Sequence, residues 1–517
     1  MLGHSMKLSS LLEQIDEIEL ASGRADDVDV CDVAFDSREV GPGTLFVALR
    51  GANVDGHRFV EAAADAGAAG VLVDRDRLPF EVDCPVLTSN NTRATLGAVG
   101  AAFYEHPSSA LSLVGVTGTN GKTTTTWMLE SLFLAAGRRS GLIGTIGYRW
   151  GEHEEPAVNT TPESLVVQKL LARMREARVT HVAMEVSSHG LSTHRLRGTR
   201  FDAAIFTNLT QDHLDFHGDM DAYRRAKVRL FDELLPASAR SGKSPTAIVN
   251  MDDEHGKWFA DRSREQGVQT VTFGLSDGVD WQAREVEQRL EGSRFLICGP
   301  HEQFAVEIPL LGDFNVSNAL AAAVAARTVG LTPDEITAGF GALGHVPGRM
   351  QRVEHDGQPT VFVDYAHTPD ALERALATLR PLCRGRLMVV FGCGGDRDRD
   401  KRAPMGRNAV DGADLVVVTS DNPRTEEPET IISQILEGVG DAPRIELGDL
   451  ARATTGVWVE PDRAEAIRRI LPATGRDDVV LIAGKGHETY QEIGRERVAF
   501  DDVEHVRSSV NTSKERV

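Results

Sequence analysis

The sequence predicts an α/β protein with about three domains, and three observations support this class. The chain has 517 residues, which suits about three domains at roughly 100–200 residues each. Short apolar runs alternate with helix-like segments along most of the chain, an order typical of α/β domains. A Gly-rich loop near residue 118 follows one such run and precedes a helix-like stretch. We expect domain boundaries near residues 107 and 346, each to within about five residues.

The first predicted domain covers residues 1–107. This part is rich in Ala and Gly and contains strand-like apolar runs at Thr44–Ala48 and Gly70–Val73. The segment His106–Ser109, with its proline and two serines, is typical of a linker. It therefore marks the expected end of this domain.

The second predicted domain covers residues 108–345. It opens with the apolar run Leu111–Val116, the Gly-rich turn and a helix-like stretch over Lys122–Ala136. An Ala-rich helix is expected at Asn315–Thr328. The other predicted strands are Gly141–Ile146, His181–Val186, Asp202–Thr207 and Ala247–Asn250.

The third predicted domain covers residues 346–517 and follows a break in the pattern at Val346-Pro347-Gly348. Its strands are apolar enough to be buried on both faces, as in a parallel sheet covered by helices. They are predicted at Thr360–Val363, Leu387–Phe391, Asp414–Val418 and Asp478–Ile482.

The charge balance excludes some classes of function. The chain carries 56 basic and 77 acidic residues, a formal net charge of −21. Proteins that hold nucleic acid or anionic membranes need a cationic surface, so we expect neither as a partner. Anionic small molecules remain possible ligands, because a local cluster of Arg and backbone N–H groups can bind them on an acidic protein.

The cysteines and the hydropathy pattern indicate a cytoplasmic protein. The five cysteines are scattered and never spaced C-x-x-C, so neither a disulfide framework nor a structural zinc site is expected. No apolar run approaches the ~18 residues of a membrane span. The segment Met1–Met6 lacks the basic and apolar regions of a secretion signal.

The Gly-rich loop predicts a site for a nucleoside triphosphate. Glycines let backbone N–H groups approach phosphate oxygens, and the helix that follows adds its positive end. A lysine in this position reaches the terminal phosphates, and the next hydroxyl suits Mg²⁺. Val116 stands where the usual pattern has its first Gly, so this is a shortened variant; the alternative is an ordinary glycine turn. The predicted loop residues are Gly118, Thr119, Asn120, Gly121, Lys122, Thr123 and Thr124.

Two further clusters follow predicted strands of the same domain. Glu185–His189 comes after one strand and Asn208–Asp215 after another. Ligands of open α/β sheets bind beyond the carboxyl ends of the strands, so Glu185 and His213 could hold Mg²⁺ beside the triphosphate. Taken alone, each is more often a hydrogen-bonded structural residue. Lys227, in the amphipathic stretch Tyr223–Leu234, is by itself typical of a solvated helix lysine.

These pieces, in this order, resemble the Mur ligase family of ATP-dependent amide-forming enzymes over nearly the whole chain. The shared motifs are Gly118–Thr124, Glu185–His189, Asn208–Asp215, Asn315–Leu320, Pro347–Arg349 and Asp364–His367. A second set is similar to the members that add the third residue of the peptidoglycan peptide: Asp36–Arg38, Asn159–Pro162, Gly392–Asp398, Asp421–Arg424 and Gly484–Glu488.

The resemblance implies a fold and an activity. It implies a small N-terminal α/β domain for the uridine nucleotide, a central ATPase-type α/β domain with the phosphate loop, and a C-terminal Rossmann-like α/β domain for the incoming amino acid. It implies that a monomer adds meso-2,6-diaminopimelate to UDP-N-acetylmuramoyl-L-alanyl-D-glutamate through an acyl phosphate, with ATP and Mg²⁺. It also implies that Lys227 carries a carbamate from CO₂ and joins Thr123, Glu185 and His213 at the metal.

The remaining roles follow from the same resemblance. The residues expected at ATP outside the loop are Asn315, Asn318, Arg349 and Asp364. Those expected at the UDP-dipeptide are Ser37, Asn159, Thr160, Thr161, Ser187, Thr193 and Arg195; the family often has Gln where this chain has Thr193. Those expected at diaminopimelate are Arg397, Asp421, Asn422, Pro423, Arg424, Gly484 and Glu488, with Arg424 on a carboxylate; by itself Arg424 could be a solvated loop arginine.

Other functions stay open at this point. One alternative is a folylpolyglutamate synthase or a different Mur ligase, and the segments Asp421–Arg424 and Asn159–Pro162 favour the assignment above. A second is a nucleotide-dependent binding or regulatory protein, and a third is a kinase. These would keep the phosphate loop without needing Arg349, Arg397 or Glu488.

Overall fold

The computed structural model describes residues 4–51, 54–354 and 359–514. The chain divides into two compact units. The first comprises Met1–Arg284, Leu296–Val306 and Ser317–Ala342, and the second comprises Glu285–Phe295, Glu307–Val316 and Leu343–Val517. The fold class is α/β, as predicted, whereas the predicted domain boundaries stay a prediction. Part of the expectation on Met1–Met6 lies outside the described residues.

The first unit begins with a five-stranded sheet in the order β2-β7-β6-β5-β4. Strands β4 to β7 are parallel, and β2 is an antiparallel edge. Leu45 and Phe46 of β5 pack into different apolar clusters, because successive side chains of a strand point to opposite faces. The strands are β2 (Glu19–Ser22), β4 (Asp32–Ala34), β5 (Thr44–Val47), β6 (Gly70–Asp74) and β7 (Val86–Ser89); the helices are α1 (Leu8–Gln14), α2 (Val60–Asp65) and α3 (Thr92–Phe103).

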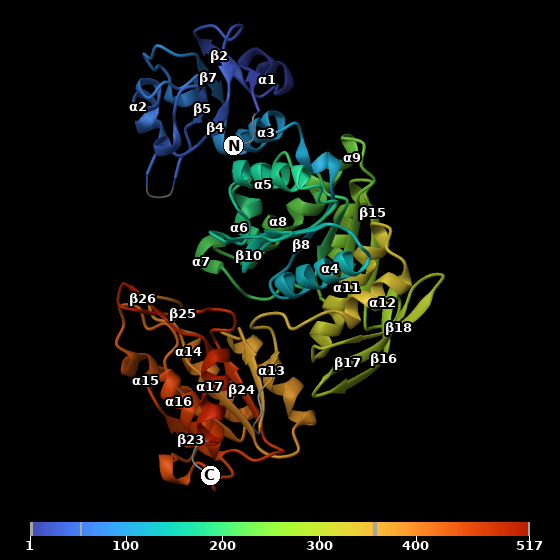
Figure 1. Cartoon of the computed structure of the whole chain (residues 1–517), viewed down its shortest axis with the longest axis vertical. Coiled ribbons are helices and arrows are strands. Elements are labelled where there is room, and N and C mark those ends of the chain that lie inside the picture. Colours follow the sequence, from blue (N-terminus) through green and yellow to red (C-terminus); the bar gives the residue numbers. More distant parts are fainter. Residues whose placement is uncertain (1–3, 52–53, 355–358, 515–517) are drawn as a thin grey trace. The chain divides into compact units, whose positions relative to one another are not determined.

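A second, eleven-stranded sheet contains the predicted phosphate loop (Figure 1). Its order is β11-β10-β9-β12-β8-β13-β14-β15-β16-β17-β18, and β9, β12, β8, β13, β14 and β15 are parallel. The carboxyl ends of β12, β8 and β13 are therefore neighbours. The strands are β8 (Ser112–Thr117), β9 (Ser140–Ile143), β10 (Gly147–Trp150), β11 (His153–Pro156), β12 (His181–Glu185), β13 (Ala203–Phe206), β14 (Thr246–Asn250), β15 (Gln269–Gly274), β16 (Trp281–Arg289), β17 (Gly292–Cys298) and β18 (Gln303–Ile308).

Two local predictions in this part need correction. The expected linker at His106–Ser109 is a short 3₁₀ turn, Pro107–Ala110, whose first two residues are buried. The expected helix Tyr223–Leu234 is α-helical only to Arg229 and then widens into a π-helical turn, Leu230–Leu234. The helices here are α4 (Lys122–Ala135), α5 (Ser164–Glu176), α6 (Ser188–Ser192), α7 (Leu214–His217), α8 (Met220–Arg229), α9 (Leu235–Arg240), α10 (Gly256–Glu265), α11 (Asp313–Thr328) and α12 (Pro333–Gly341).

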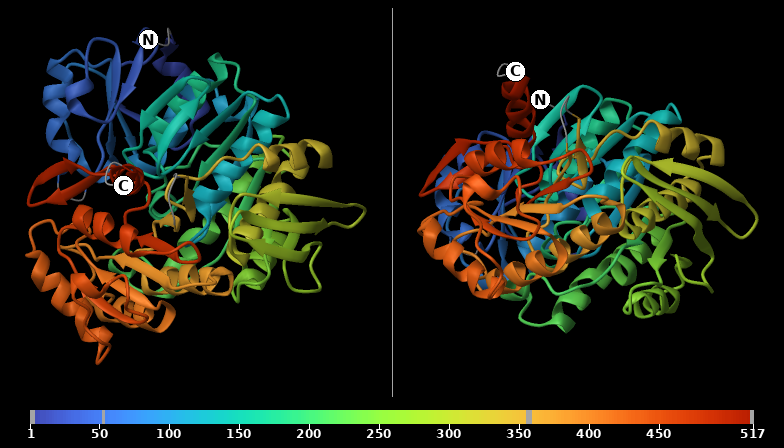
Figure 2. Two further views of the ribbon diagram at one scale, coloured as in Figure 1. Left: turned by 60° about the horizontal axis from the view of Figure 1, so that its bottom comes forward. Right: turned by 90° about the horizontal axis from the view of Figure 1, so that it is seen from below.

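The second unit contains a six-stranded sheet in the order β19-β20-β24-β21-β22-β23, whose edge strand β19 is antiparallel to β20 while the other pairs are parallel. Figure 2 shows this part of the chain in orange and red. Val389 and Phe391 of β21 pack into one apolar cluster and Met388 and Val390 into another, so both faces are buried as predicted. The strands are β19 (Gln351–Val353), β20 (Thr360–Asp364), β21 (Leu387–Phe391), β22 (Leu415–Val418), β23 (Gly456–Val459) and β24 (Val479–Ala483). The other elements are α13 (Pro369–Leu379), α14 (Arg402–Gly412), α15 (Pro428–Val439), α16 (Arg463–Ile470), α17 (Asp502–Lys514) and the hairpin β25 (Tyr490–Ile493)–β26 (Glu496–Ala499).

The described helices include none that is long and apolar enough to cross a membrane. The five cysteines are free thiols.

Candidate active site

The loop between β8 and α4 has the backbone of a phosphate cradle. Gly121 has a φ of +88°, and a Cβ atom there would lie 2.3 Å from Oδ1 of Asn318. A Cβ atom at Gly118 would lie 1.9 Å from Oγ1 of Thr207. Only glycine fits either position, so the backbone stays open to an incoming group. α4 begins at Lys122 and directs its positive end at the same place.

The loop is held in shape by residues that follow β13. The backbone N–H of Thr119 donates to the carbonyl of Asn208 at 2.8 Å. The backbone N–H of Asn120 donates to Oδ1 of Asn208 at 2.9 Å, and Nδ2 of Asn208 donates to the carbonyl of Asn120 at 3.1 Å. Asn208 opens the cluster that the sequence placed beside the loop, so this predicted neighbourhood is confirmed.

The side chain of Lys122, predicted to reach the terminal phosphates, lies over the phosphate loop. Its Nζ atom donates to the carbonyls of Gly118 and Thr119, at 2.9 and 2.7 Å. Thr124 is buried in the first turn of α4. The glycine backbone, the helix start and the cation of Lys122 together fit the phosphates of a nucleoside triphosphate.

Glu185 and Thr123 meet at the carboxyl end of β12. Oγ1 of Thr123 donates to Oε2 of the buried Glu185 at 3.0 Å. Thr145, which the sequence did not single out, donates to the same carboxylate from its backbone N–H at 2.8 Å and its hydroxyl at 3.0 Å. Thr145 follows the carboxyl end of β9, at the same edge of the sheet as Glu185. That position after a strand is the sequence signal that could have identified Thr145 as a site residue.

Lys227 is buried, which overturns its interpretation as a solvated helix lysine. The side chain is 1% exposed, and Nζ donates to the carbonyl of Gly118 at 2.7 Å. Burial, and secondarily the positive charge of Lys122, hold the pKa of Lys227 well below its usual value. The face of α8 that carries Tyr223 and Lys227 turns toward the phosphate loop, which local amphipathicity does not reveal.

His213 belongs to the same neighbourhood. It has a φ of +54°, directly before α7, and its ring centroid lies 4.9 Å from that of His189. Burial lowers the pKa of His213, and the charges of Lys122 and Lys227 lower it further, whereas Asp212 raises it. A neutral imidazole is the form that binds metals.

The donor set at this edge fits Mg²⁺ better than a softer metal. Within the described part of the chain, no three His, Cys, Asp or Glu side chains are grouped to hold a metal. Thr123 and Glu185 instead offer hydroxyl and carboxylate oxygens, the ligands that Mg²⁺ prefers.

Most residues expected at the UDP-dipeptide lie together beside Glu185. Oγ1 of Thr161 donates to the carbonyl of Glu185 at 2.9 Å and accepts from the backbone N–H of Ser187, also at 2.9 Å. Arg195 donates to the carbonyl of Thr161 at 2.9 Å. The others are Thr160, whose hydroxyl lies 3.0 Å from that of Thr145, and Asn159, whose carbonyl accepts from Tyr148 at 2.7 Å.

Two of these expected residues stand apart. The hydroxyl of Thr193 donates to the carbonyl of His189 at 2.6 Å and ends α6, so it is engaged with its own helix. Ser37 begins a short 3₁₀ turn, Ser37–Glu39, that follows β4 of the first sheet.

The residues expected at ATP outside the loop fall in both units. Asn318 lies against Gly121, as described, and the buried Asn315 donates to the carbonyl of Leu311 at 2.7 Å. In the second unit, Asp364 accepts from the backbone N–H groups of Met350 and Ala366, at 2.6 and 2.8 Å. Burial raises the pKa of Asp364, which the charge of Arg349 opposes. The guanidinium of Arg349 stacks 4.9 Å from the ring of Tyr365.

The two predicted amino-acid motifs of the second unit meet in one network. Nδ2 of Asn422 donates to Oε2 of Glu488 at 2.8 Å. Lys485 is fully buried and donates to the same Oε2 and to Oδ1 of Asn422, both at 3.0 Å. A Cβ atom at Gly484 would lie 2.8 Å from Oδ2 of the buried Asp421, so the two loops pack tightly. Lys485 stands inside a predicted motif, yet the sequence did not identify it as a site residue.

Arg424 is not a solvated loop arginine. Its side chain is 22% exposed, and Nε lies 2.7 Å from Oε2 of Glu492 on β25. Nη1 donates to the carbonyl of Gly395 at 2.8 Å. Pro423 packs against Gly395, because a Cβ atom added at Gly395 would lie 1.9 Å from the carbonyl oxygen of Pro423. Arg397 is exposed, and no motif in the sequence pointed to Glu492.

Comparison with known proteins decides the family. Residues 31–104 match the Mur ligase family catalytic domain, residues 116–326 the Mur ligase middle domain, and residues 348–486 the Mur ligase glutamate ligase domain. The chain belongs to the Mur ligase family. This Mur ligase is 42% identical over 507 residues to the UDP-N-acetylmuramoyl-L-alanyl-D-glutamate--2,6-diaminopimelate ligase of Geobacillus kaustophilus, covering 98% of this chain and 99% of that one.

Two further similarities extend over nearly the full length of this Mur ligase. A protein of the same name from Gloeobacter violaceus is 44% identical over 493 residues, covering 95% of this chain and 96% of that one. A solved structure with the same name is 33% identical, with a TM-score of 0.71 and 99% coverage of both chains. The three-domain α/β architecture predicted from the sequence is that of the family.

Proposed function

We propose that this Mur ligase joins meso-2,6-diaminopimelate to UDP-N-acetylmuramoyl-L-alanyl-D-glutamate, with ATP as energy source, in peptidoglycan precursor synthesis. The observation that carries the proposal is the network joining Asn422, Lys485 and Glu488, with Arg424 beside it. Asn422 and Arg424 lie in the motif Asp421–Arg424, and Lys485 and Glu488 in Gly484–Glu488, which the resemblance associates with this activity. The relatives that bear this activity in their names match 98% and 95% of the chain.

ATP solves a chemical problem that the joining reaction poses. A carboxylate is a poor electrophile, and condensing it with an amine in water is uphill. An oxygen of the D-glutamyl carboxylate attacks the γ-phosphorus, the bond to ADP breaks, and an acyl phosphate forms. The amine of diaminopimelate then attacks the acyl carbon, loses a proton, and phosphate leaves. Two anions must meet in the first step, so catalysis consists mainly of positioning and charge neutralisation.

Lys122 and Arg349 supply positive charge for that first step in this proposal. Lys122 exchanges its two loop carbonyls for phosphate oxygens when ATP binds. The loop, together with Asn315, Asn318 and Asp364, binds and orients the nucleotide. Mg²⁺, when bound, neutralises charge on the phosphates and on the acyl phosphate.

The metal would be held by Thr123, Glu185, His213 and a modified Lys227. An ammonium at Lys227 would repel a cation, whereas a carbamate offers anionic oxygens. Burial lowers the pKa of Lys227 and so favours the neutral form, whose Nζ lone pair can attack the carbon of CO₂ and then release a proton. The carbamate is thus the form of Lys227 that suits its place beside the phosphate loop.

The two organic substrates bind to separate groups of residues in this proposal. Ser37 contacts the uridine nucleotide, and the muramoyl-dipeptide is held by Asn159, Thr160, Thr161, Ser187, Thr193 and Arg195. Diaminopimelate is held by Arg397, Asp421, Asn422, Pro423, Arg424, Gly484 and Glu488. Arg424 offers a planar fork of donors to the distal carboxylate, which lysine lacks.

We also propose that the protein is a cytoplasmic monomer that acts on small molecules without nucleic acid or a membrane. The formal net charge of −21 supports the exclusion of polyanionic partners.

A phosphate-release assay tests the proposed function. Release should require ATP, Mg²⁺, the dipeptide nucleotide and diaminopimelate together, and a Lys122→Ala variant should release none. Release that needs a folate and glutamate instead would assign a folylpolyglutamate synthase. Phosphate release without an amino acid would point to an ATPase, whereas ADP formation without phosphate release would point to a phosphotransferase.

A further inference from the structure

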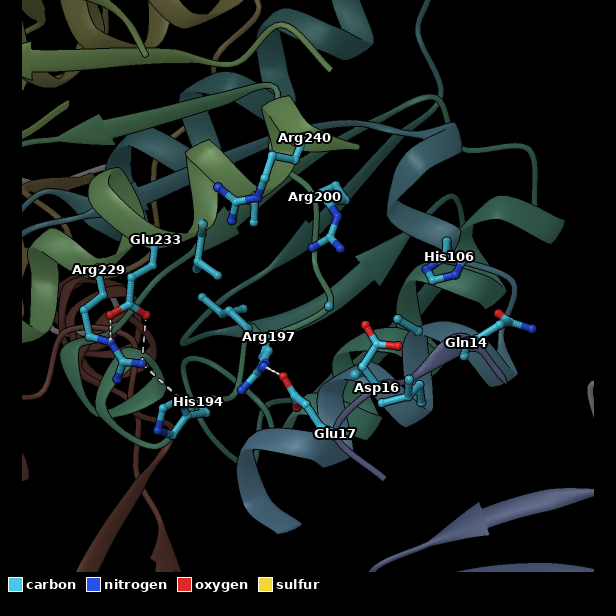
Figure 3. Close-up of a pocket in the computed structure, with 18 of the residues that line it drawn as sticks. Gln14, Asp16, Glu17, His106, His194, Arg197, Arg200, Arg229, Glu233 and Arg240 are labelled. Carbon is cyan, nitrogen blue, oxygen red and sulfur yellow. Dashed lines mark hydrogen bonds and ion pairs between the residues drawn. The ribbon is translucent and has the colours of Figure 1, made fainter. Parts of the chain in front are cut away.

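A cavity of about 570 Å³ lies in the first unit, away from the phosphate loop (Figure 3). His106, Arg200 and Arg240 line it, and they precede β8, β13 and β14 respectively. These strands are adjacent and parallel, so the three residues gather at the amino ends of the strands. The phosphate loop occupies the opposite, carboxyl edge, and the cavity is therefore a separate place on the protein.

Two of the four arginines that line the cavity are neutralised by the protein. Arg229 makes paired contacts with Glu233, both at 2.9 Å, and Arg197 is paired with Glu17. Figure 3 shows both pairs, drawn with dashed lines along the cavity wall. These pairs leave neither guanidinium in need of a further anion.

Arg200 and Arg240 differ from these pairs. Neither guanidinium has a hydrogen bond or ion pair among the residues that the structure describes, and both line the cavity, near one another in Figure 3. Burial and the neighbouring charge of Arg240 lower the pKa of Arg200. Burial and the charge of Arg200 likewise lower the pKa of His106. Arg200 is thus partly buried beside the charge of the exposed Arg240, an arrangement that a bound anion would stabilise.

Apolar and polar side chains share the rest of the lining. Ile15, Ala101, Leu196 and Leu234 form part of the wall. The volume falls within the roughly 300–1,000 Å³ of small-molecule sites, which combine apolar walls with a few convergent polar groups. A phosphate alone would fill only a small part of it.

We propose that this cavity binds a phosphorylated small molecule, whose phosphate lies between Arg200 and Arg240 and whose organic part contacts the apolar wall. A phosphate monoester carries nearly two negative charges and three acceptor oxygens, which match two guanidinium forks better than a single carboxylate does. Asp16 also lines the cavity and opposes an anion.

Calorimetric titration with phenyl phosphate tests the proposal. The full-length protein is first saturated with Mg²⁺ and a non-hydrolysable ATP analogue, so that the phosphate loop is filled. We expect one phenyl phosphate per chain, at least tenfold weaker binding in the double variant Arg200→Gln, Arg240→Gln, and unchanged binding in Arg24→Gln, an exposed control. Asp16→Asn should bind more tightly, because it removes a like charge.

A parallel titration with inorganic phosphate identifies the source of the phosphate group. Tighter binding of phenyl phosphate indicates an ester, and equal binding indicates free phosphate; both support the site. No binding at millimolar concentration, or undiminished binding in the double variant, would overturn it. The double variant should keep the Tm of the unmodified protein, because neither side chain has a protein partner to lose.

Discussion

The Nε atom of Arg424 lies 2.7 Å from Oε2 of Glu492. The arginine proposed to bind a substrate carboxylate is therefore already paired with a carboxylate of the protein. Glu492 also contacts Arg497, whose Nη2 atom is 3.1 Å from Oε1. A substrate carboxylate that binds the Nε edge of Arg424 must therefore displace Glu492, and Arg497 can keep the displaced side chain paired. When lysine binds instead, Glu492 can stay paired with Arg424, so the guanidinium is not left without an anion. The free-energy cost of binding lysine is therefore smaller than for an unpaired arginine.

Glu492→Gln should lower the KM for diaminopimelate, because the substrate no longer competes with an internal carboxylate. The pair is partly exposed and worth up to about 1 kcal/mol, so we expect roughly a 2- to 5-fold decrease with little change in kcat. Steady-state kinetics with diaminopimelate as the varied substrate measure this. Glu496→Gln, an exposed residue on β26, is the matched control. An increased KM would mean that Glu492 helps to bind the substrate instead.

Arg424→Ala should raise the KM for diaminopimelate by about 10- to 100-fold, since a charged hydrogen bond is worth roughly 1.5–3 kcal/mol. Binding of ATP and of the dipeptide nucleotide should stay nearly intact, which calorimetry can measure directly. Normal diaminopimelate kinetics in this variant would remove Arg424 from the substrate site.

Lys227→Ala should be nearly inactive, and a short-chain carboxylic acid that replaces the carbamate should restore part of the activity. The reason is that the buried Nζ lies 2.7 Å from the carbonyl of Gly118, beside the loop that binds ATP. Phosphate release with and without added acid measures the rescue. Lys169→Ala, an exposed lysine of α5, should behave as the unmodified protein. Wild-type activity of Lys227→Ala would make this lysine structural only.

Glu426→Gln should lower the free energy of unfolding at neutral pH by about 3 kcal/mol, because Glu426 pairs with the fully buried Arg402 at 3.0 Å. The hydrogen bonds from Arg402 lower the pKa of Glu426 to about 2. Below about pH 4.5 the unfolded chain therefore binds a proton that the folded protein does not, and the stabilisation falls as pH approaches 2.

Urea unfolding between pH 7 and pH 3.5 measures that dependence. The difference between the unmodified protein and Glu426→Gln should be constant above pH 5 and narrow below it. Glu429→Gln, an exposed residue at the start of α15, should show no such difference. If the difference in free energy of unfolding between the two proteins stayed constant down to pH 3.5, the ionised Glu426 carboxylate would not be what stabilises the folded protein.

The strands and the phosphate loop could be predicted from the sequence because their signals are local. β21 was predicted at the residues where it lies, and α4 to within one residue. Both predictions depend on short stretches of about ten residues: a run of apolar side chains for β21, and the glycines before the helix for α4.

The rest of the site depends on contacts between distant segments, which no local pattern carries. Lys227 looks solvated in its own helix and is buried only because the loop around Gly118 packs on that helix. Arg424 and Glu492 are brought together by the hairpin β25–β26. The helix that contains Lys227 also changes to a π-helical turn at Leu230. No spacing of apolar residues in the sequence predicts that change.

A competition experiment tests the central claim, addition of diaminopimelate to the dipeptide nucleotide, most directly. The protein is given ATP, Mg²⁺, UDP-N-acetylmuramoyl-L-alanyl-D-glutamate, and equal concentrations of meso-diaminopimelate and lysine. The nucleotide products are then measured by mass spectrometry. The diaminopimelate adduct should dominate, with one ADP formed per adduct; a predominant lysine adduct, or ATP consumption without any adduct, would refute the proposed function.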